Sequence, residues 1–345
     1  MRKQILTAAV MAACAGMSFA ALADESTTVG GKAYIDFTNI DSKTNGTKND
    51  ASGLGFDLKR FYLSVSHTFD DMWSANLTTD VNYAAQCTTC SPTDVNLYVK
   101  KAYLQAKFSD AAVLRAGSAD MPWIPYVEHA WGYRYVEKTL IDRTGFGTSA
   151  DWGAHLGGKL MDGMINYAVS AVNGNGYKHP DRSKNLDFAG RVGVMPVKGL
   201  NLAVGFYNGK RGKDTQTYTG TLNTASRWDV LAAFSQDMFN VGAEYFSAED
   251  WSTTKAKDKA DGYSVFGSVK PVEKIAVFAR YDEVKPNKTT NSSLKDTYYT
   301  VGAAYTARKN VDLALAYKGE EMKTSGGGPK LLEYSEVGVW TQVKF

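Results

Sequence analysis

The sequence predicts an all-β chain that crosses a membrane as an antiparallel up-and-down β-barrel of about sixteen strands. Three observations predict this fold. Apolar and polar residues alternate through almost the whole chain beyond its first segment. Short turns and long polar connections follow one another in strict alternation. No later stretch approaches the roughly 20 apolar residues that a membrane helix requires.

Residues 1–23 are expected to be a cleaved signal peptide and not part of the fold. Arg2 and Lys3 give a basic start, a weakly apolar stretch follows, and residues 21–23 match the small-x-small cleavage pattern. In the alternative, the chain is a lipoprotein acylated at Cys14, although the residue three positions earlier is not the usual Leu. Export of either kind places the chain in or beyond the bacterial envelope.

The barrel domain is expected to span residues 24–345 and to be nearly neutral. The full sequence has 39 Lys and Arg against 36 Asp and Glu, and the signal peptide carries two of the basic residues, which leaves 37 against 36. A nucleic-acid-binding chain would show a basic stripe or a strong net charge, so nucleic acid is not an expected partner. The 20 Tyr, 15 Phe and 32 Gly against only 8 Pro favour strands and tight turns.

The strands are predicted from the alternation, because successive residues of a strand point to opposite faces. In residues 61–66 the odd positions are apolar, and in residues 102–108 the even positions are. The same two-residue period recurs at 73–83, 228–234, 299–305 and 311–317. Each segment therefore has one apolar face and one polar face.

The connections distinguish a barrel from a soluble sandwich. Seven short turns are expected near residues 70–72, 109–111, 161–162, 196–198, 237–238, 271–273 and 309–310. Eight longer polar stretches lie near 41–53, 86–94, 119–147, 174–186, 208–226, 250–262, 286–295 and 322–332. These fifteen connections join sixteen strands, with short turns at one end and long loops at the other, as in outer-membrane barrels.

The final strand, 333–345, ends on an aromatic residue, Phe345, with three valines on the same face. A terminal aromatic of this kind resembles the signal for outer-membrane barrel assembly, and closure removes strand edges that lipid does not tolerate. Aromatic residues near the other strand ends are expected to form girdles at the membrane surfaces. They are Trp73, Tyr83, Phe108, Trp228, Phe239 and Tyr317. The expected location is the bacterial outer membrane, with its lipids as partners.

Cys87 and Cys90 form a Cys-Thr-Thr-Cys sequence. In an oxidising compartment such a pair forms a small local disulfide or remains a free pair. Haem attachment would need a His at position 91, which is Ser, and the neighbourhood offers no further zinc ligands. The sequence therefore indicates no cofactor and no metal site.

Four stretches resemble the phosphate-selective porin O and P family of Gram-negative porins: residues 56–63, 114–123, 137–143 and 187–192. The resemblance spans most of the chain beyond the signal peptide. It implies a sixteen-stranded homotrimer whose third loop folds into the lumen. It does not imply phosphate selectivity, which depends on an arginine ladder and a lysine cluster, whereas the lumen face expected here has mixed charge.

The polar face of each strand is expected to line the lumen. It carries the basic residues Arg60, Lys101, Lys107, Arg115, Arg191, Arg227 and Lys318. It also carries the acidic residues Asp36, Asp80, Asp187, Asp312 and Glu320. Opposed charges orient and filter small ions, and the longer basic list predicts a weak anion preference. In the alternative, each arginine has no role in selectivity and is a solvated charge or a partner in a cross-strand ion pair.

The third connection, 119–147, is predicted to fold into the lumen. Its many aromatic residues would form a large apolar patch if they lay on the surface, which monomers rarely expose. Folded inward, the loop would narrow the pore and present charged residues to it. The expected constriction residues are Glu128, Arg134, Glu137, Asp142 and Arg143. In the alternative, the aromatic residues pack at a subunit contact or at the outer rim.

The sequence thus predicts a porin, a passive channel for small hydrophilic solutes and ions. The five tyrosines expected inside do not align as a sugar channel would require. Enzymatic function is not expected, because the chain has four His and neither a Gly-x-Ser-x-Gly nor a His-Glu-x-x-His sequence. Two alternatives remain: a barrel that sheathes an electron-transfer protein, and a structural or adhesive barrel with a closed lumen.

Overall fold

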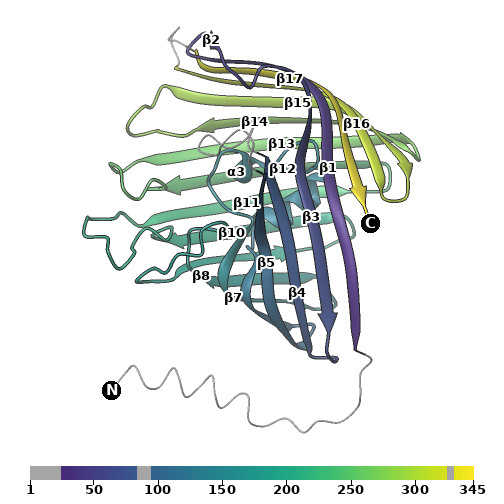
Figure 1. Cartoon of the computed structure of the whole chain (residues 1–345), viewed down its shortest axis with the longest axis vertical. Helices are drawn as coiled ribbons and strands as arrows, with labels where there is room; N and C mark the ends of the chain where they lie inside the picture. Colours follow the sequence, from purple (N-terminus) through teal and green to yellow (C-terminus); the bar gives the residue numbers. More distant parts are fainter. Residues whose placement is uncertain (1–24, 84–94, 325–329) are drawn as a thin grey trace.

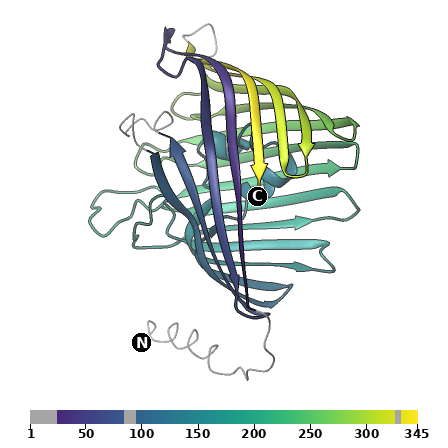
Figure 2. The ribbon, with the colours of Figure 1, turned by 45° about the vertical axis from the view of Figure 1, so that its right-hand side comes forward.

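A computed structural model describes residues 25–83, 95–324 and 330–345, which form one closed antiparallel sheet (Figures 1 and 2). The strand β1 pairs with β3 on one edge and with β17 on the other, so the first and last long strands close the ring. Of the 17 strands, β2 has two residues and extends the end of β1, which leaves sixteen long strands. The predicted sixteen-stranded barrel is confirmed.

The elements alternate in direction around the barrel, and the only helices in the described ranges lie between β6 and β7. The elements are β1 (Ser26–Thr44), β2 (Thr47–Lys48), β3 (Gly53–Thr68), β4 (Trp73–Tyr83), β5 (Val95–Ser109), β6 (Ala112–Asp120), α2 (Ile124–Trp131), α3 (Leu140–Arg143), β7 (Ala150–Leu160), β8 (Ile165–Val172), β9 (Asp187–Val194), β10 (Leu200–Gly209), β11 (Ala225–Ser235), β12 (Phe239–Glu249), β13 (Lys259–Val272), β14 (Ile275–Lys285), β15 (Leu294–Arg308), β16 (Val311–Thr324) and β17 (Lys330–Lys344). Two predictions, the signal peptide at 1–23 and the Cys87–Cys90 disulfide, lie outside the described residues and stay predictions.

The predicted alternation sets which side chains face the lumen. In β14, Phe278, Arg280 and Asp282 point inward and are at most 3 % exposed, whereas Val277 and Tyr281 point outward. Outward-facing valines, leucines and aromatic residues are exposed on nearly every strand. An apolar exterior around a polar interior is the arrangement that lipid requires of a barrel.

A row of aromatic side chains crosses the outer face of β11 to β16, toward the end that carries the long loops. Its neighbours pack ring against ring: Trp228 and Tyr245 have centroids 5.1 Å apart, and Tyr299 and Tyr317 are 6.0 Å apart. Near the opposite end, Phe61 lies 6.2 Å from Phe345. Such rings mark the two interfaces of a membrane.

Short turns close the end opposite to the long loops. In the β3–β4 turn, the Asp70 carboxylate accepts hydrogen bonds from the backbone N–H groups of Met72 and Trp73 at 2.8 and 2.6 Å. In the β7–β8 turn, Met161 and Asp162 both have positive φ values, of 53° and 54°. Each turn thus satisfies its own backbone groups and needs few residues.

Loop 3, residues 121–149, enters the barrel and packs its buried apolar residues into the hydrophobic core formed with the wall, with α3 visible inside the ring of strands (Figure 1). Trp131 of α2 is 1 % exposed and packs edge-on against Phe266 and Phe278 of the wall. Gly205 leaves room for the loop, because a Cβ there would lie 2.5 Å from Trp123. The predicted inward fold of this loop is confirmed. Neither helix has the length and apolar character needed to cross a membrane.

Candidate functional site

Loop 3 is fixed to the barrel wall through Arg143 at the end of α3. The guanidinium group contacts the carboxylates of Asp282 at 3.1 Å, Asp296 at 3.0 Å and Glu320 at 2.9 Å. Three neighbouring strands, β14 to β16, each supply one of these acids. The Arg143 side chain is only 7 % exposed, so this cation acts on the wall and not on the open lumen.

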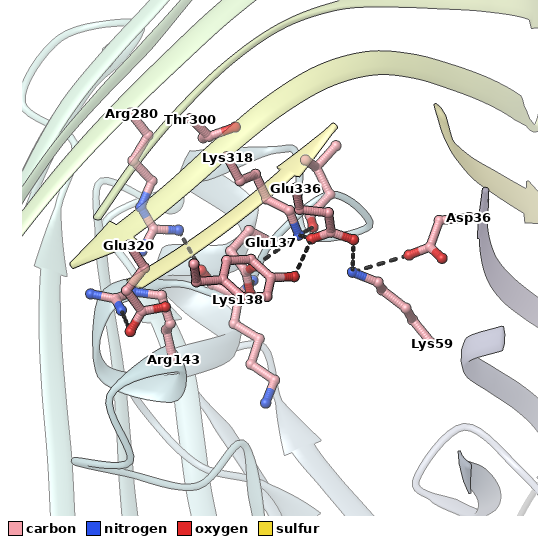
Figure 3. A network of polar contacts seen from close by, with 12 residues as sticks. Asp36, Lys59, Glu137, Lys138, Arg143, Arg280, Thr300, Lys318, Glu320 and Glu336 are labelled. Atoms are coloured by element: carbon pink, nitrogen blue, oxygen red, sulfur yellow. Dashed lines mark hydrogen bonds and ion pairs between the residues drawn. The ribbon is translucent and has the colours of Figure 1, made fainter. Parts of the chain in front are cut away.

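A second chain of ion pairs begins at Glu137 of loop 3. Glu137 contacts Lys318 at 3.2 Å, and Lys318 also pairs with Glu336 (Figure 3). Lys59 continues the chain, at 3.6 Å from Glu336 and 3.0 Å from Asp36. Burial raises the pKa of Glu137, but the charges of Lys318 and Lys59 outweigh it and hold that pKa below its ordinary value. We call both sets the anchoring network: Arg143, Asp282, Asp296, Glu320, Glu137, Lys318, Glu336, Lys59 and Asp36.

The start of loop 3 has its own contacts with the wall. The indole N–H of Trp123 donates to Glu244 of β12 at 2.7 Å. Arg191 of β9 donates from Nε to the Pro122 carbonyl at 2.9 Å, and its guanidinium lies 3.6 Å from the ring centre of Tyr126. The loop is therefore held at its beginning, in its middle and at its end.

On the other side of loop 3 the lumen stays open as two cavities that meet. One faces the long loops and the other faces the short turns, and both are lined by Lys100, Arg134 and Ser149. We call this passage the corridor. Its charged lining residues are Lys32, Arg60, Lys100, Lys101, Asp120, Glu128, Arg134, Lys138, Asp142 and Lys178.

The corridor has an excess of positive charge, with seven basic and three acidic side chains in its lining. Arg134 holds Glu128 at 2.6 Å and Asp142 at 3.4 Å. Lys101 pairs with Asp120 at 2.6 Å. Arg60 pairs with a wall residue behind the lining, Asp80, at 2.9 Å. Within the described residues, four corridor lysines lie within 4.0 Å of no carboxylate: Lys32, Lys100, Lys138 and Lys178.

Two of these lysines belong to loops, and both are crowded by other cations. Burial lowers the pKa of Lys138, and the charges of Arg60 and Arg134 lower it further against the opposing charge of Asp142. Burial and Arg60 likewise lower the pKa of Lys178. In Figure 3 the Lys138 side chain extends away from the anchoring network. Both ammonium groups are therefore sites where an incoming anion is favoured.

The structure divides the predicted constriction residues between two roles. Glu128, Arg134 and Asp142 line the corridor, whereas Glu137 and Arg143 belong to the anchoring network.

The structure divides the predicted lining residues as well. Arg60 and Lys101 line the corridor, Asp80 accepts from Arg60, and Arg115 donates to Gln105 near the short-turn end. Arg191 and Arg227 instead bind loop 3, since Arg227 donates to the Phe146 carbonyl.

Sequence reasoning missed several corridor and network lysines. Strict alternation places Lys59 and Lys100 outside, because their neighbours Arg60 and Lys101 face inward. The structure has β-bulges at both places: the β1–β3 pairing passes over Lys59, and the β4–β5 pairing passes over Lys100. Each bulge turns two successive basic residues inward. A basic pair inside an alternating strand is the one available signal.

Lys138 and Lys178 were missed for another reason, because both lie in loops, where alternation does not predict the direction of a side chain.

In the part of the chain that the structure describes, no group of three or more His, Cys, Asp or Glu side chains is placed to hold a metal ion.

The chain is similar to porins. A family model described as Gram-negative porin matches residues 7–325. No curated protein sequence matches the chain.

Solved structures share the fold at low sequence identity. An anion-selective porin from Comamonas acidovorans has 13% identity and a TM-score of 0.64 over 93% of this chain and 100% of that one. The outer membrane channel DcaP of Acinetobacter baumannii has 14% identity and a TM-score of 0.64 over 95% and 99%. OmpT of Vibrio cholerae, in a trimer form, has 12% identity and a TM-score of 0.60 over 93% and 99%.

Proposed function

The chain belongs to the Gram-negative porin family, and from this premise we propose that it is an outer-membrane channel with a weak preference for anions. Small hydrophilic solutes and ions pass by diffusion along the corridor between loop 3 and the wall formed by β1 and β3 to β5. The proposal includes no catalytic step and no cofactor. The solute experiences the charges that line this corridor.

The observation that carries the anion preference is the set of four corridor lysines for which the described residues provide no carboxylate partner. An ion pair presents little net charge to a passing ion, whereas an unpaired lysine in a narrow, low-dielectric passage presents its full charge. Seven basic against three acidic lining residues give the corridor a net positive potential. Such a potential concentrates anions and repels cations.

The alternatives are less well supported. A sheath for an electron-transfer protein needs a wide lumen, and loop 3 occupies one side of this one. An adhesive barrel needs no aqueous passage, and a buried lysine such as Lys100, with no carboxylate partner among the described residues, would then cost stability without a gain. A sugar channel needs exposed ring faces, and Tyr34 and Tyr135 are each 4 % exposed.

We also propose that the channel is a homotrimer whose contact covers the seam between β3 and β4. Among the described residues, β3 pairs with β4 only over Leu63–Thr68, so residues 53–62 lack a partner on that edge. Lipid cannot satisfy free backbone N–H and C=O groups. Leu54 and Phe56 beside the seam are 68% and 77% exposed. A second copy of the chain would cover both features.

The trimer contact is tested by placing one charge on each of two outward faces. We expect Phe56→Arg to dissociate the detergent-extracted oligomer, as measured by native mass spectrometry. Val204→Arg is the matched control, because Val204 is 58% exposed on β10, away from the seam. An unchanged oligomer in the Phe56 variant would place the contact elsewhere.

The finer resemblance to the phosphate-selective porin O and P family is kept as a hypothesis about ancestry and trimeric assembly. It adds no phosphate selectivity, because the corridor cations are five lysines and two arginines on separate strands and loops and form no arginine ladder. A passage open to small anions in general is the function that these residues support best.

The experiment that tests the function is the zero-current potential of the purified protein in a planar bilayer under a salt gradient. We expect stepwise conductance and the sign of an anion-favouring channel. A cation-favouring sign would mean that Glu128, Asp142 and Asp120 outweigh the lysines. Absence of conductance would contradict the channel itself.

A further inference from the structure

The two cavities of the corridor meet at Lys100 and Arg134, with lysines on both sides of the junction. We propose that this junction is a binding site for small organic dianions, with one carboxylate on each side of Lys100. The inference rests on the proposed anion channel and deepens it, because it names a class of solute that the channel retains.

Lys100 is the centre of the site. It is 9 % exposed, its ammonium lies 3.3 Å from the Tyr62 hydroxyl, and it lies 4.5 and 5.8 Å from the ring centres of Tyr62 and Tyr177. Ring faces and a hydroxyl stabilise the ammonium only in part. A buried charge without a counter-ion is costly, so an anion that enters the corridor supplies the missing partner.

The cavity toward the long loops provides the first carboxylate position. Lys138 and Lys178 lie there with no carboxylate partner in the described part of the chain, and Arg60 shares its charge with Asp80. The hydroxyl of Ser149 in the lining adds a neutral hydrogen-bond donor. Ammonium and hydroxyl donors together are the usual recognition set for an oxyanion.

The cavity toward the short turns provides the second position. Lys32 is unpaired among the described residues, and Lys101 is shared with Asp120. Arg134 binds one acid on each side of the junction, Asp142 in the cavity toward the long loops and Glu128 in the cavity toward the short turns. The positive charge is therefore concentrated in two places, separated by a region in which Glu128 and Asp142 more than offset the charge of Arg134.

A molecule with two carboxylates on a short chain satisfies both positions at once. Its second group binds intramolecularly, at a high effective concentration, after the first is bound. A monocarboxylate of the same length satisfies one position only. A compact dianion such as sulfate carries the same charge but does not span the junction.

The test is the block of single-channel chloride current by succinate, butyrate and sulfate at neutral pH. We expect succinate to reduce the current in a saturable way, with an apparent affinity at least about tenfold above butyrate and above sulfate. Lys100→Met should remove most of this difference. Lys178→Met, a loop substitution that leaves the barrel intact, should weaken the block as well. Lys295→Met is the control, because Lys295 pairs with Glu283 on the outer face and should change nothing.

Equal block by succinate and butyrate would overturn the proposal while leaving the anion channel in place. Block by sulfate as strong as by succinate would replace the spanning site with a single compact one. A wild-type channel that prefers cations would instead contradict the proposed function itself, and the zero-current potential identifies that case separately.

Discussion

The two sides of the lumen carry similar numbers of charged residues, nine in the anchoring network and ten along the corridor, and use them differently. In the anchoring network each of the three cations has at least two acidic partners: Arg143 has three, and Lys318 and Lys59 have two each. Along the corridor, four lysines have none among the described residues. The charges of the anchoring network hold loop 3 in place, whereas those of the corridor lysines remain available to a solute.

The difference shows how an oppositely charged partner changes the role of a charged residue inside a barrel. A buried ion pair fixes geometry, because removing one partner leaves the other uncompensated, but it presents little net field. An unpaired lysine fixes no geometry and presents its whole charge to the passage. Position inside the lumen therefore does not by itself make a residue part of the selectivity filter.

Removing α2 should have the largest effect on the difference between the two sides of the lumen. Excision of residues 124–135 takes away the bulk that separates the corridor from the opposite wall, so we expect a several-fold rise in single-channel conductance. Deletion of residues 215–221 in the loop between β10 and β11 is the control and should leave conductance unchanged. A constant conductance after the α2 deletion would mean that loop 3 does not limit the passage.

Arg143→Met should disrupt the anchoring network and leave the corridor lysines in place. The substitution leaves the buried Asp296 and the partly buried Glu320 without this cation, and removing one partner of a buried pair costs about 3–5 kcal/mol. We expect a lower unfolding midpoint in urea and a noisier open-channel current, since loop 3 loses its attachment to β14 to β16. The double variant with Asp296→Asn should recover part of the stability. Wild-type stability in the single variant would contradict the anchoring role.

Raising the pH should weaken the corridor side alone. Burial and neighbouring cations lower the pKa of Lys138 and Lys178 below the ordinary lysine value of 10.5. A lysine with a lowered pKa loses its proton at a lower pH than an exposed lysine does. Anion preference should therefore decline on the alkaline side of neutrality, before ordinary lysines titrate. In the double variant Lys138→Met, Lys178→Met this early decline should be absent, and its persistence would point to other groups.

The smallest effect is expected from an ion pair that belongs to neither side. Lys259 and Glu249 pair at 2.7 Å, but their side chains are 63% and 54% exposed. Exposed pairs contribute at most about 1 kcal/mol. Lys259→Met should change the unfolding midpoint only slightly and leave the zero-current potential where it was. A larger change in either quantity would mean that charge outside the corridor also matters.

The fold was predictable from the sequence because it depends on patterns that a linear chain displays. Alternation gives the faces, and the order of short and long connections gives the strand number. The aromatic content of the third connection gave its inward fold, since Trp123 and Trp131 would otherwise lie exposed in a surface loop. Each of these predictions depends on residues that are close together in the sequence and not on contacts elsewhere in the barrel.

The site was only partly predictable. Alternation tells which face Arg191 and Arg227 occupy, but not that loop 3 lies against them. The bulges that turn Lys59 and Lys100 inward depend on how neighbouring strands twist and pair, and the consecutive basic pairs are their only signal in the sequence. Whether a lumen charge is compensated depends on partners far away in the sequence.

The central claim is that the unpaired corridor lysines set the ion preference. The most direct test compares the zero-current potentials of two triple variants. One is Lys100→Met, Lys138→Met, Lys178→Met in the corridor, and the other is Lys43→Met, Lys295→Met, Lys323→Met on the outer face of the barrel. We predict that the first loses the anion-favouring potential and that the second keeps it. A corridor variant that retains the wild-type potential, or an outer-face variant that loses it, would contradict the claim.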